Sequence, residues 1–234
     1  EGRAYLVMEY VRGQTLDEHI DGAGQVDEVQ ILQIARTVAG ALARIHRHGV
    51  VHRDIKPGNI LIRDSDGAVK LIDFGFAVRT TEADDSDAVV GTFRYSAPEQ
   101  TGMLKRPVDG RADLYALGVV LYECATGVPP FDAGDAAELV RLHAVERPPA
   151  LRQRNPDISR ALSEIVERLL AKDPDDRYPD SEALLADLDR LDEIDATLRE
   201  GGDPNLGSMR LSGEEAPATP MFGRGSEYRQ LESA

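Results

Sequence analysis

The chain has 234 residues and a net charge of −15, because 42 acidic residues outnumber 27 Lys and Arg. This balance argues against a nucleic-acid partner, since proteins that bind a phosphate backbone usually present a stripe of positive charge. With 41% hydrophobic residues the chain can bury a core, and its single cysteine, Cys124, excludes an internal disulfide and fits a reducing, cytoplasmic compartment.

The first residues predict a buried strand and then a short helix. Residues 5–11, YLVMEYV, form an apolar and β-prone run that Gly13 interrupts. Thr15 and Glu18 have the spacing of a capping box, in which each side chain bonds the backbone of the other residue at a helix start. We therefore expect a helix to begin there.

A longer helix and a hairpin are predicted next. Asp27 and Gln30 mark the start of this helix in a similar way. Apolar residues at positions 29, 32, 35, 38, 39, 42 and 45 follow the helical period. Two apolar runs, 60–62 and 69–72, then flank Asp66-Gly67, a pair that is typical of hairpin turns.

The remainder is predicted to be mainly helical. Residues 79–90 are acidic and lack periodicity, which predicts a loop, whereas 113–126 is apolar nearly all round and predicts a fully buried helix. This apolar run is too short to cross a membrane. Amphipathic helices are predicted near 135–145, 159–171 and 181–199. After Gly201 the sequence becomes rich in Gly, Pro and Ser, which predicts a flexible linker.

Three motifs carry most of the functional information. They are HRDIKPGNIL at His52–Leu61, Asp73-Phe74-Gly75, and GTFRYSAPE at Gly91–Glu99. Over about residues 4–200 the sequence resembles the large lobe of a eukaryotic-type (bacterial) Ser/Thr protein kinase. This resemblance implies an α+β, protein kinase-like fold, with a mainly α-helical large lobe and only the last strand and hinge of the small lobe.

The resemblance assigns roles in phosphoryl transfer, a reaction that depends on charge placement and an oriented nucleophile. Asp54 matches the catalytic-loop aspartate that accepts or orients the proton of the substrate hydroxyl, and Lys56 matches the lysine that neutralises the γ-phosphate. Asn59 matches a ligand of one Mg²⁺. Asp73 matches the ligand that links the metals to the β- and γ-phosphates. The implied cofactors are therefore ATP and Mg²⁺.

The resemblance also implies an adenine pocket at the start of the chain. Met8 would guard the back of the pocket, and the backbone of Glu9 and Val11 would bond the edge of the adenine. Leu61 would form the floor of the pocket.

A further set of residues is implied to have structural roles. His52 and Phe74 resemble members of an apolar stack that couples the two lobes, and Asp113 resembles the buried aspartate that ties down the catalytic-loop backbone. Glu99 and Arg177 match a buried ion pair of the large lobe. The histidines at 19, 46, 48 and 143 show no ligand spacing, so we expect surface or packing roles for them.

Regulation is implied at the residue before the catalytic aspartate. In the family, an arginine such as Arg53 commonly pairs with a phosphorylated residue, and Thr80 and Thr81 are candidate acceptors. The acidic residues within 82–87 could instead occupy the Arg53 site without phosphate. Thr92 resembles the threonine that contacts the catalytic Asp and Lys in Ser/Thr kinases.

The expected organisation has four parts: 1–14, the end of the small lobe and the hinge; 15–200, the large lobe; 201–219, a flexible linker; and 220–234, which resembles the start of an AAA-type ATPase module. The last resemblance rests on the pattern F-G-R-x-x-E-x-x-x-L from Phe222 to Leu231. No Gly-rich phosphate loop or strand lysine precedes Tyr5. We therefore expect a fragment with little or no activity by itself.

Three functions are compatible with these motifs. The first is a Ser/Thr protein kinase whose partners are a protein substrate and a fused C-terminal signalling or ATPase domain. The second is a pseudokinase, a regulatory binding domain of a larger signalling ATPase. The third is a small-molecule phosphotransferase with a kinase-like fold, against which Lys56 and the Gly91–Glu99 segment argue because such enzymes usually lack both.

Overall fold

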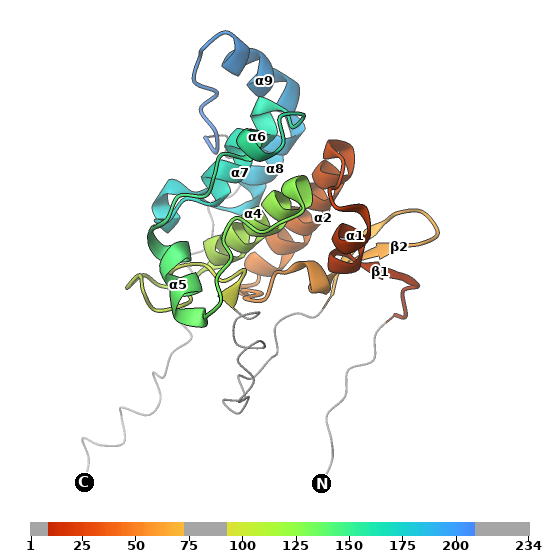
Figure 1. The fold of residues 1–234 in the computed structure, drawn as a ribbon. Helices are drawn as coiled ribbons and strands as arrows, with labels where there is room; N and C mark the ends of the chain where they lie inside the picture. Colours follow the sequence, from red (N-terminus) through yellow and green to blue (C-terminus); the bar gives the residue numbers. More distant parts are fainter. Residues whose placement is uncertain (1–8, 73–92, 209–234) are drawn as a thin grey trace, which may run out of the picture.

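A computed structural model describes residues 9–72 and 93–208 of the chain. This part is mostly helical, as the sequence predicts, and it has a three-stranded sheet beside α1 at one edge (Figure 1). The strands are β1 (Gly13–Thr15), β2 (Ile60–Arg63) and β3 (Val69–Leu71), and the 3₁₀ turns are η1 (Pro57–Asn59) and η2 (Pro174–Asp176). The helices are α1 (Leu16–Ala23), α2 (Glu28–His46), α4 (Gly110–Thr126), α5 (Ala136–Val145), α6 (Leu151–Arg154), α7 (Arg160–Leu169), α8 (Ser181–Asp189) and α9 (Leu191–Arg199).

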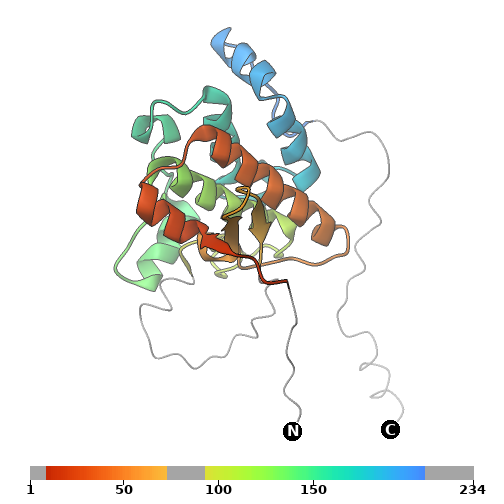
Figure 2. The ribbon, with the colours of Figure 1, turned by 90° about the vertical axis from the view of Figure 1, so that its right-hand side faces the viewer.

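Helix α4 forms the centre of the core. It packs against α2 on one side and α7 on the other (Figures 1 and 2). Nearly all of its side chains are buried. Gly118 allows the close approach of α7, because a Cβ atom there would lie 2.7 Å from the Cβ of Leu169. The prediction of a helix buried on every side is confirmed. No helix in the described ranges is long and apolar enough to cross a membrane.

The predicted helix starts are confirmed by their caps. A carboxylate oxygen of Glu18 accepts the Thr15 N–H at 2.9 Å, and Asp27 Oδ1 accepts the Gln30 N–H at 3.0 Å. Both bonds satisfy backbone donors that lack a partner within the helix.

The buried face of α2 agrees with the predicted stripe except at its first position. Val29 was expected in the apolar stripe but is 79% exposed, whereas Ile31 and Ile34 are fully buried. Val29 lies on the solvent side of the first turn of α2, whereas Ile31, two residues later, already lies in the core. Leu42, which was expected in the stripe, is fully buried.

The antiparallel sheet has the order β1-β2-β3 and includes the predicted hairpin. In its turn, Gly67 has a φ of +68°, and the Asp66 carboxylate accepts two bonds from the Arg63 guanidinium at 2.7 and 2.6 Å. Strand β2 begins directly after Asn59, so the sheet fixes one end of the loop that carries the motif residues. The predicted strand at 5–11 lies largely outside the described residues, and positions 9–11 are not in a strand.

The helix predicted at 181–199 is instead two helices, α8 and α9. The break lies at Arg190, where φ is −114° and ψ is 28°. The guanidinium of Arg190 bonds Asp187 and the carbonyl of Pro204, and the Gly207 N–H donates to Asp187 Oδ2 at 2.7 Å. These contacts turn the chain at α8 and hold 204–207, part of the expected linker, against it.

Candidate active site

The buried carboxylate of Asp113 holds the loop between α2 and β2 in place. Its two oxygens accept the backbone N–H groups of His52 and Arg53 at 2.8 and 2.7 Å. Asp113 is 1% exposed and lies in the first turn of the central helix α4. A buried carboxylate that accepts two backbone bonds fixes the path of the loop, because either orphaned donor would cost about 1–3 kcal/mol.

His46 is a third partner of Asp113, and the sequence reasoning missed it. Its Nε2 lies 2.8 Å from Asp113 Oδ2, and its Nδ1 lies 3.3 Å from Ser181 Oγ. Gly110 leaves room for the imidazole, because a Cβ there would come within 2.7 Å of the ring. His46 therefore joins the end of α2, the start of α4 and the start of α8. The pairing spans 67 positions, so no local spacing announces it.

The loop that Asp113 holds brings together the side chains of Asp54, Lys56 and Asn59. Lys56 Nζ lies 2.8 Å from Asp54 Oδ2, and Asn59 Nδ2 donates to the same oxygen at 2.9 Å. Asn59 Nδ2 also donates to the backbone carbonyl of Asp54 at 2.8 Å. The side chains of Asp54 and Lys56 are 34% and 39% exposed, so this cluster is open to a ligand from solvent.

Arg53 adopts an unusual backbone conformation directly before this cluster. Its φ is +67°, a region that non-glycine residues rarely adopt and that costs about 1–3 kcal/mol when the surroundings impose it. The two N–H bonds to Asp113 at positions 52 and 53 are part of what imposes it. The result is a fixed direction for the Asp54 backbone.

Glu99 and Arg177 form a buried ion pair deeper in the fold. Nη1 and Nη2 of Arg177 donate to the two carboxylate oxygens of Glu99 at 2.7 and 3.0 Å, and both side chains are at most 1% exposed. Arg177 also donates to the carbonyl oxygens of Ala171, Lys172 and Arg111. The guanidinium is thus fully bonded in the interior, which a buried charge requires.

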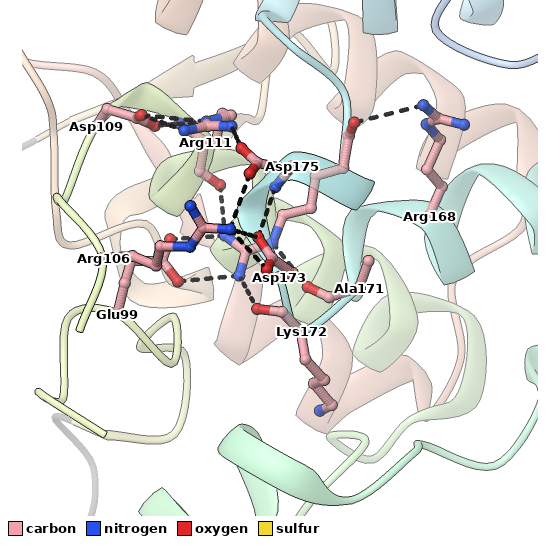
Figure 3. Close-up of polar contacts among 10 residues, drawn as sticks. Glu99, Arg106, Asp109, Arg111, Arg168, Ala171, Lys172, Asp173 and Asp175 are labelled. Atoms are coloured by element: carbon pink, nitrogen blue, oxygen red, sulfur yellow. Dashed lines mark hydrogen bonds and ion pairs between the residues drawn. The ribbon is translucent and has the colours of Figure 1, made fainter. Parts of the chain in front are cut away.

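A layer of more exposed ion pairs lies over this buried pair (Figure 3). Arg106 bonds Asp173 and Asp175, and Arg111 bonds Asp109 and Asp175. Burial would raise the pKa of Asp109, but the bonds from Arg111 outweigh it and lower that pKa. The layer links the segment before α4 to η2.

Tyr95 and Glu123 form another contact that the sequence reasoning did not single out. Tyr95 Oη donates to Glu123 Oε2 at 2.7 Å, which joins the middle of the Gly91–Glu99 motif to the end of α4. Burial raises the pKa of both groups. The Glu123 carboxylate raises the pKa of Tyr95 further because it disfavours a phenolate, whereas the hydrogen bond from Tyr95 opposes the rise for Glu123. The partners lie 28 positions apart, so only the fold reveals the pair.

The residues expected around adenine lie at the sheet. Leu61 is half-buried in β2, where it pairs with Thr15 on one side and Lys70 on the other. Lys70 Nζ bonds the exposed carboxylate of Glu9 at 2.5 Å, which brings Glu9 to the same sheet. Val11 is half-buried just before β1.

The remaining site residues lie outside the described residues. They are Met8, Asp73, Phe74, Thr80, Thr81 and Thr92. Their roles stay predictions from the sequence. Within the two described ranges, no group of three or more His, Cys, Asp or Glu side chains could hold a metal by itself.

The chain spans about a third of the length of the curated relatives it matches. Serine/threonine-protein kinase pkn3 of Myxococcus xanthus is 38% identical over 204 residues, which cover 82% of this chain and 37% of that protein. PrkC of Bacillus subtilis is 37% identical, over 84% of this chain and 31% of its own length. PknB of Mycolicibacterium smegmatis is 39% identical, over 81% of this chain and 30% of its own.

Solved structures and a family model agree with these relatives. The PknI kinase domain of Mycobacterium tuberculosis superimposes with a TM-score of 0.60 at 31% identity, covering 79% of this chain and 64% of that one. The model of the protein kinase domain matches residues 1–187. Because this match covers most of the chain, including the loop and the buried ion pair described above, the chain belongs to the protein kinase domain family.

Proposed function

We propose that this domain acts as a Ser/Thr protein kinase, which transfers the γ-phosphoryl group of ATP to a Ser or Thr hydroxyl of a protein. The observation that carries this proposal is the partly exposed cluster in which the Asp54 carboxylate contacts both Lys56 and Asn59. The family match and the names of the bacterial relatives support it.

In this proposal each residue of the cluster has a distinct task. Asp54 orients the substrate hydroxyl and accepts its proton as the new O–P bond forms and the bond to the leaving ADP oxygen breaks. Lys56 is the cation next to that carboxylate and stabilises the negative charge of the transferring group. Asn59, through its two bonds to Asp54, holds the carboxylate in place.

The donor set of the cluster fits Mg²⁺, which would supply charge neutralisation at the phosphates. The amide nitrogen of Asn59 makes both bonds to Asp54, so the amide oxygen Oδ1 is the atom suited to a hard cation. The other expected protein ligand, Asp73, lies outside the described residues. A site with so few protein ligands is typical of Mg²⁺, which is bound by one or two side chains together with substrate phosphates and water.

The regulatory proposal concerns the residue before Asp54. We infer that autophosphorylation at Thr80 or Thr81 supplies a phosphate that pairs with Arg53 and orders the loop between them. Phosphopeptide mapping of the active protein is the test. The absence of phosphate from residues 79–90 in fully active protein would exclude this mechanism.

The wider organisation is also a proposal. We infer the divisions 1–14, 15–200, 201–219 and 220–234, with an ATPase-type module beginning near Phe222, from the composition and the F-G-R-x-x-E pattern. A cytoplasmic location rests on the single, buried Cys124, which has no disulfide partner in the chain. Limited proteolysis of the full-length protein tests the boundary, because cleavage within 201–219 is expected first.

The proposed function is tested by phosphate incorporation from labelled ATP into protein, in the full-length protein that carries this domain. Asp54→Ala should reduce the rate by about 10²–10⁴-fold, the usual contribution of a positioned general base. Asp64→Ala is the matched control, because this exposed aspartate lies at the end of β2 away from the cluster. Equal incorporation by wild type and Asp54→Ala would refute the catalytic assignment and favour the pseudokinase alternative.

A further inference from the structure

The side chain of Gln100 bridges two parts of the site that are far apart in sequence. Its Nε2 donates to the backbone carbonyl of Arg53 at 3.2 Å, across 47 positions. Its Oε1 accepts the backbone N–H of Ala97 at 2.9 Å. Because one partner is an acceptor and the other a donor, the contacts fix which end of the carboxamide faces each of them.

The carbonyl that Gln100 holds belongs to a peptide group that is hydrogen-bonded on both edges. Arg53 has a φ of +67°, and the peptide bond that follows it leads directly into Asp54. The N–H of this same peptide donates to His52 Nδ1 at 3.4 Å. Gln100 and His52 therefore act on opposite edges of one peptide plane, and the orientation of that plane sets the direction of the Asp54 side chain.

The other end of the bridge is a rigid support. Residues 97–100 form a turn in which the Gln100 N–H also donates to the Ala97 carbonyl at 2.9 Å. The next residue inward, Glu99, is clamped by Arg177 with both side chains buried. Because Gln100 is half-buried and extends from this fixed turn, its side chain has little freedom to move, and it therefore restricts the position of the loop.

We infer that Gln100 is a positioning residue that couples the turn 97–100, at the end of the Gly91–Glu99 motif, to the carboxylate of Asp54. This inference rests on the proposed kinase function. The coupling runs from the buried ion pair, through the Gln100 carboxamide, to the Arg53–Asp54 peptide. Neither the motifs nor the roles implied by the resemblance assign a task to Gln100.

The test uses Gln100→Glu in the full-length protein. Glutamate keeps the size of the side chain and can still accept the Ala97 N–H, but it places a carboxylate oxygen against the Arg53 carbonyl instead of a donor. We expect kcat to fall by about 10- to 100-fold, as a small misplacement of a catalytic group can cause, while KM for ATP stays within about twofold. Backbone hydrogen exchange in the segment 52–59 should be faster than in the wild type, and the melting temperature should be the same as that of the wild type.

Gln33→Glu is the matched control. Gln33 Nε2, on α2, also donates to a backbone carbonyl at 3.1 Å, but this is the carbonyl of Gly67 in the turn between β2 and β3. This variant should retain wild-type kcat and exchange at 52–59. If the wild type is active and Gln100→Glu has the same kcat, the inference about Gln100 is wrong, but the proposed function stands. A wild-type protein without phosphate transfer would overturn the proposed function, and this inference with it.

Discussion

Two acid–base pairs of this molecule have nearly the same geometry and opposite surroundings. The Asp54–Lys56 pair closes at 2.8 Å with both side chains about a third exposed, whereas the Glu99–Arg177 pair closes at 2.7 Å with both at most 1% exposed. In water the first pair gains little and can exchange its partners for a ligand. The second has no alternative partners, so breaking it leaves a bare charge in the core. Burial, and not distance, separates the site from its scaffold.

The largest effect is expected at the buried pair. Arg177→Met should lower the free energy of unfolding by about 3–5 kcal/mol, because Glu99 is left buried and unpaired. Arg106→Met, which removes an exposed arginine from the overlying layer, is the control and should cost about 1 kcal/mol or less. Urea unfolding measures both values.

A second variant separates lost pairing from lost packing at the same position. The double change Glu99→Leu with Arg177→Met removes the orphaned charge and should recover part of the stability that Arg177→Met loses. If the double variant is no more stable than the single one, the cost does not arise from the unpaired carboxylate. The claim that burial makes the Glu99–Arg177 pair essential for stability would then be wrong.

The next effect concerns the exposed pair. Lys56→Met should reduce the phosphate-transfer rate by about 100-fold, equivalent to about 2.7 kcal/mol, since it removes one charge from the transition state. Its melting temperature should match wild type, because the lysine is partly exposed and its pair contributes little to folding. Lys105→Met, a change of an exposed lysine elsewhere, is the control. If Lys56→Met lowered the stability but not the transfer rate, Lys56 would belong to the scaffold and not to the site.

The last effect is a pH dependence next to the buried pair. Burial, together with the nearby Arg177 charge, lowers the pKa of Lys172 from 10.5 to about 8. Its ammonium lies 4.4 Å from the Phe131 ring, with no hydrogen-bond partner among the described residues. Between pH 8 and 10.5 the unfolded chain therefore binds more protons than the folded one, so this group makes stability rise with pH across that window.

Lys172→Met isolates this contribution. The variant should be more stable than wild type below pH 8, where the folded protein must bury a charged amine, and the difference should shrink toward pH 10.5. Chemical denaturation across this range, with wild type and variant in parallel, gives the difference directly. A constant difference at all pH values would show that Lys172 does not titrate in the folded protein within the window.

The sequence predicts those parts of this fold that depend on near neighbours. The caps at Thr15 and Asp27 and the turn at Asp66-Gly67 are local, because each involves residues within three positions. The apolar composition of α4 likewise predicts a helix that is buried all round. Local chemistry decides these features before any tertiary contact forms.

Local patterns do not predict contacts between distant residues. The Glu99–Arg177 pair, across 78 positions, is expected only from the family resemblance, and two other long-range contacts are not expected at all. His46 meets Asp113 across 67 positions, and Gln100 meets Arg53 across 47. The break at Arg190 follows from its bonds to Asp187 and Pro204, which a continuous apolar stripe does not reveal. These partners are set by how the helices pack, so one sequence without the fold offers no signal for them.

The most direct test compares one acidic residue from each pair in the same samples. Asp54→Asn and Glu99→Gln make the same change of a carboxylate to an amide, one in the exposed pair and one in the buried pair. Phosphate transfer and thermal unfolding are measured for both in the full-length protein. Asp54→Asn should lose transfer at an unchanged melting temperature, and Glu99→Gln should lower the melting temperature by several degrees. Wild-type transfer by Asp54→Asn, or equal melting shifts in the two variants, would contradict the division between site and scaffold.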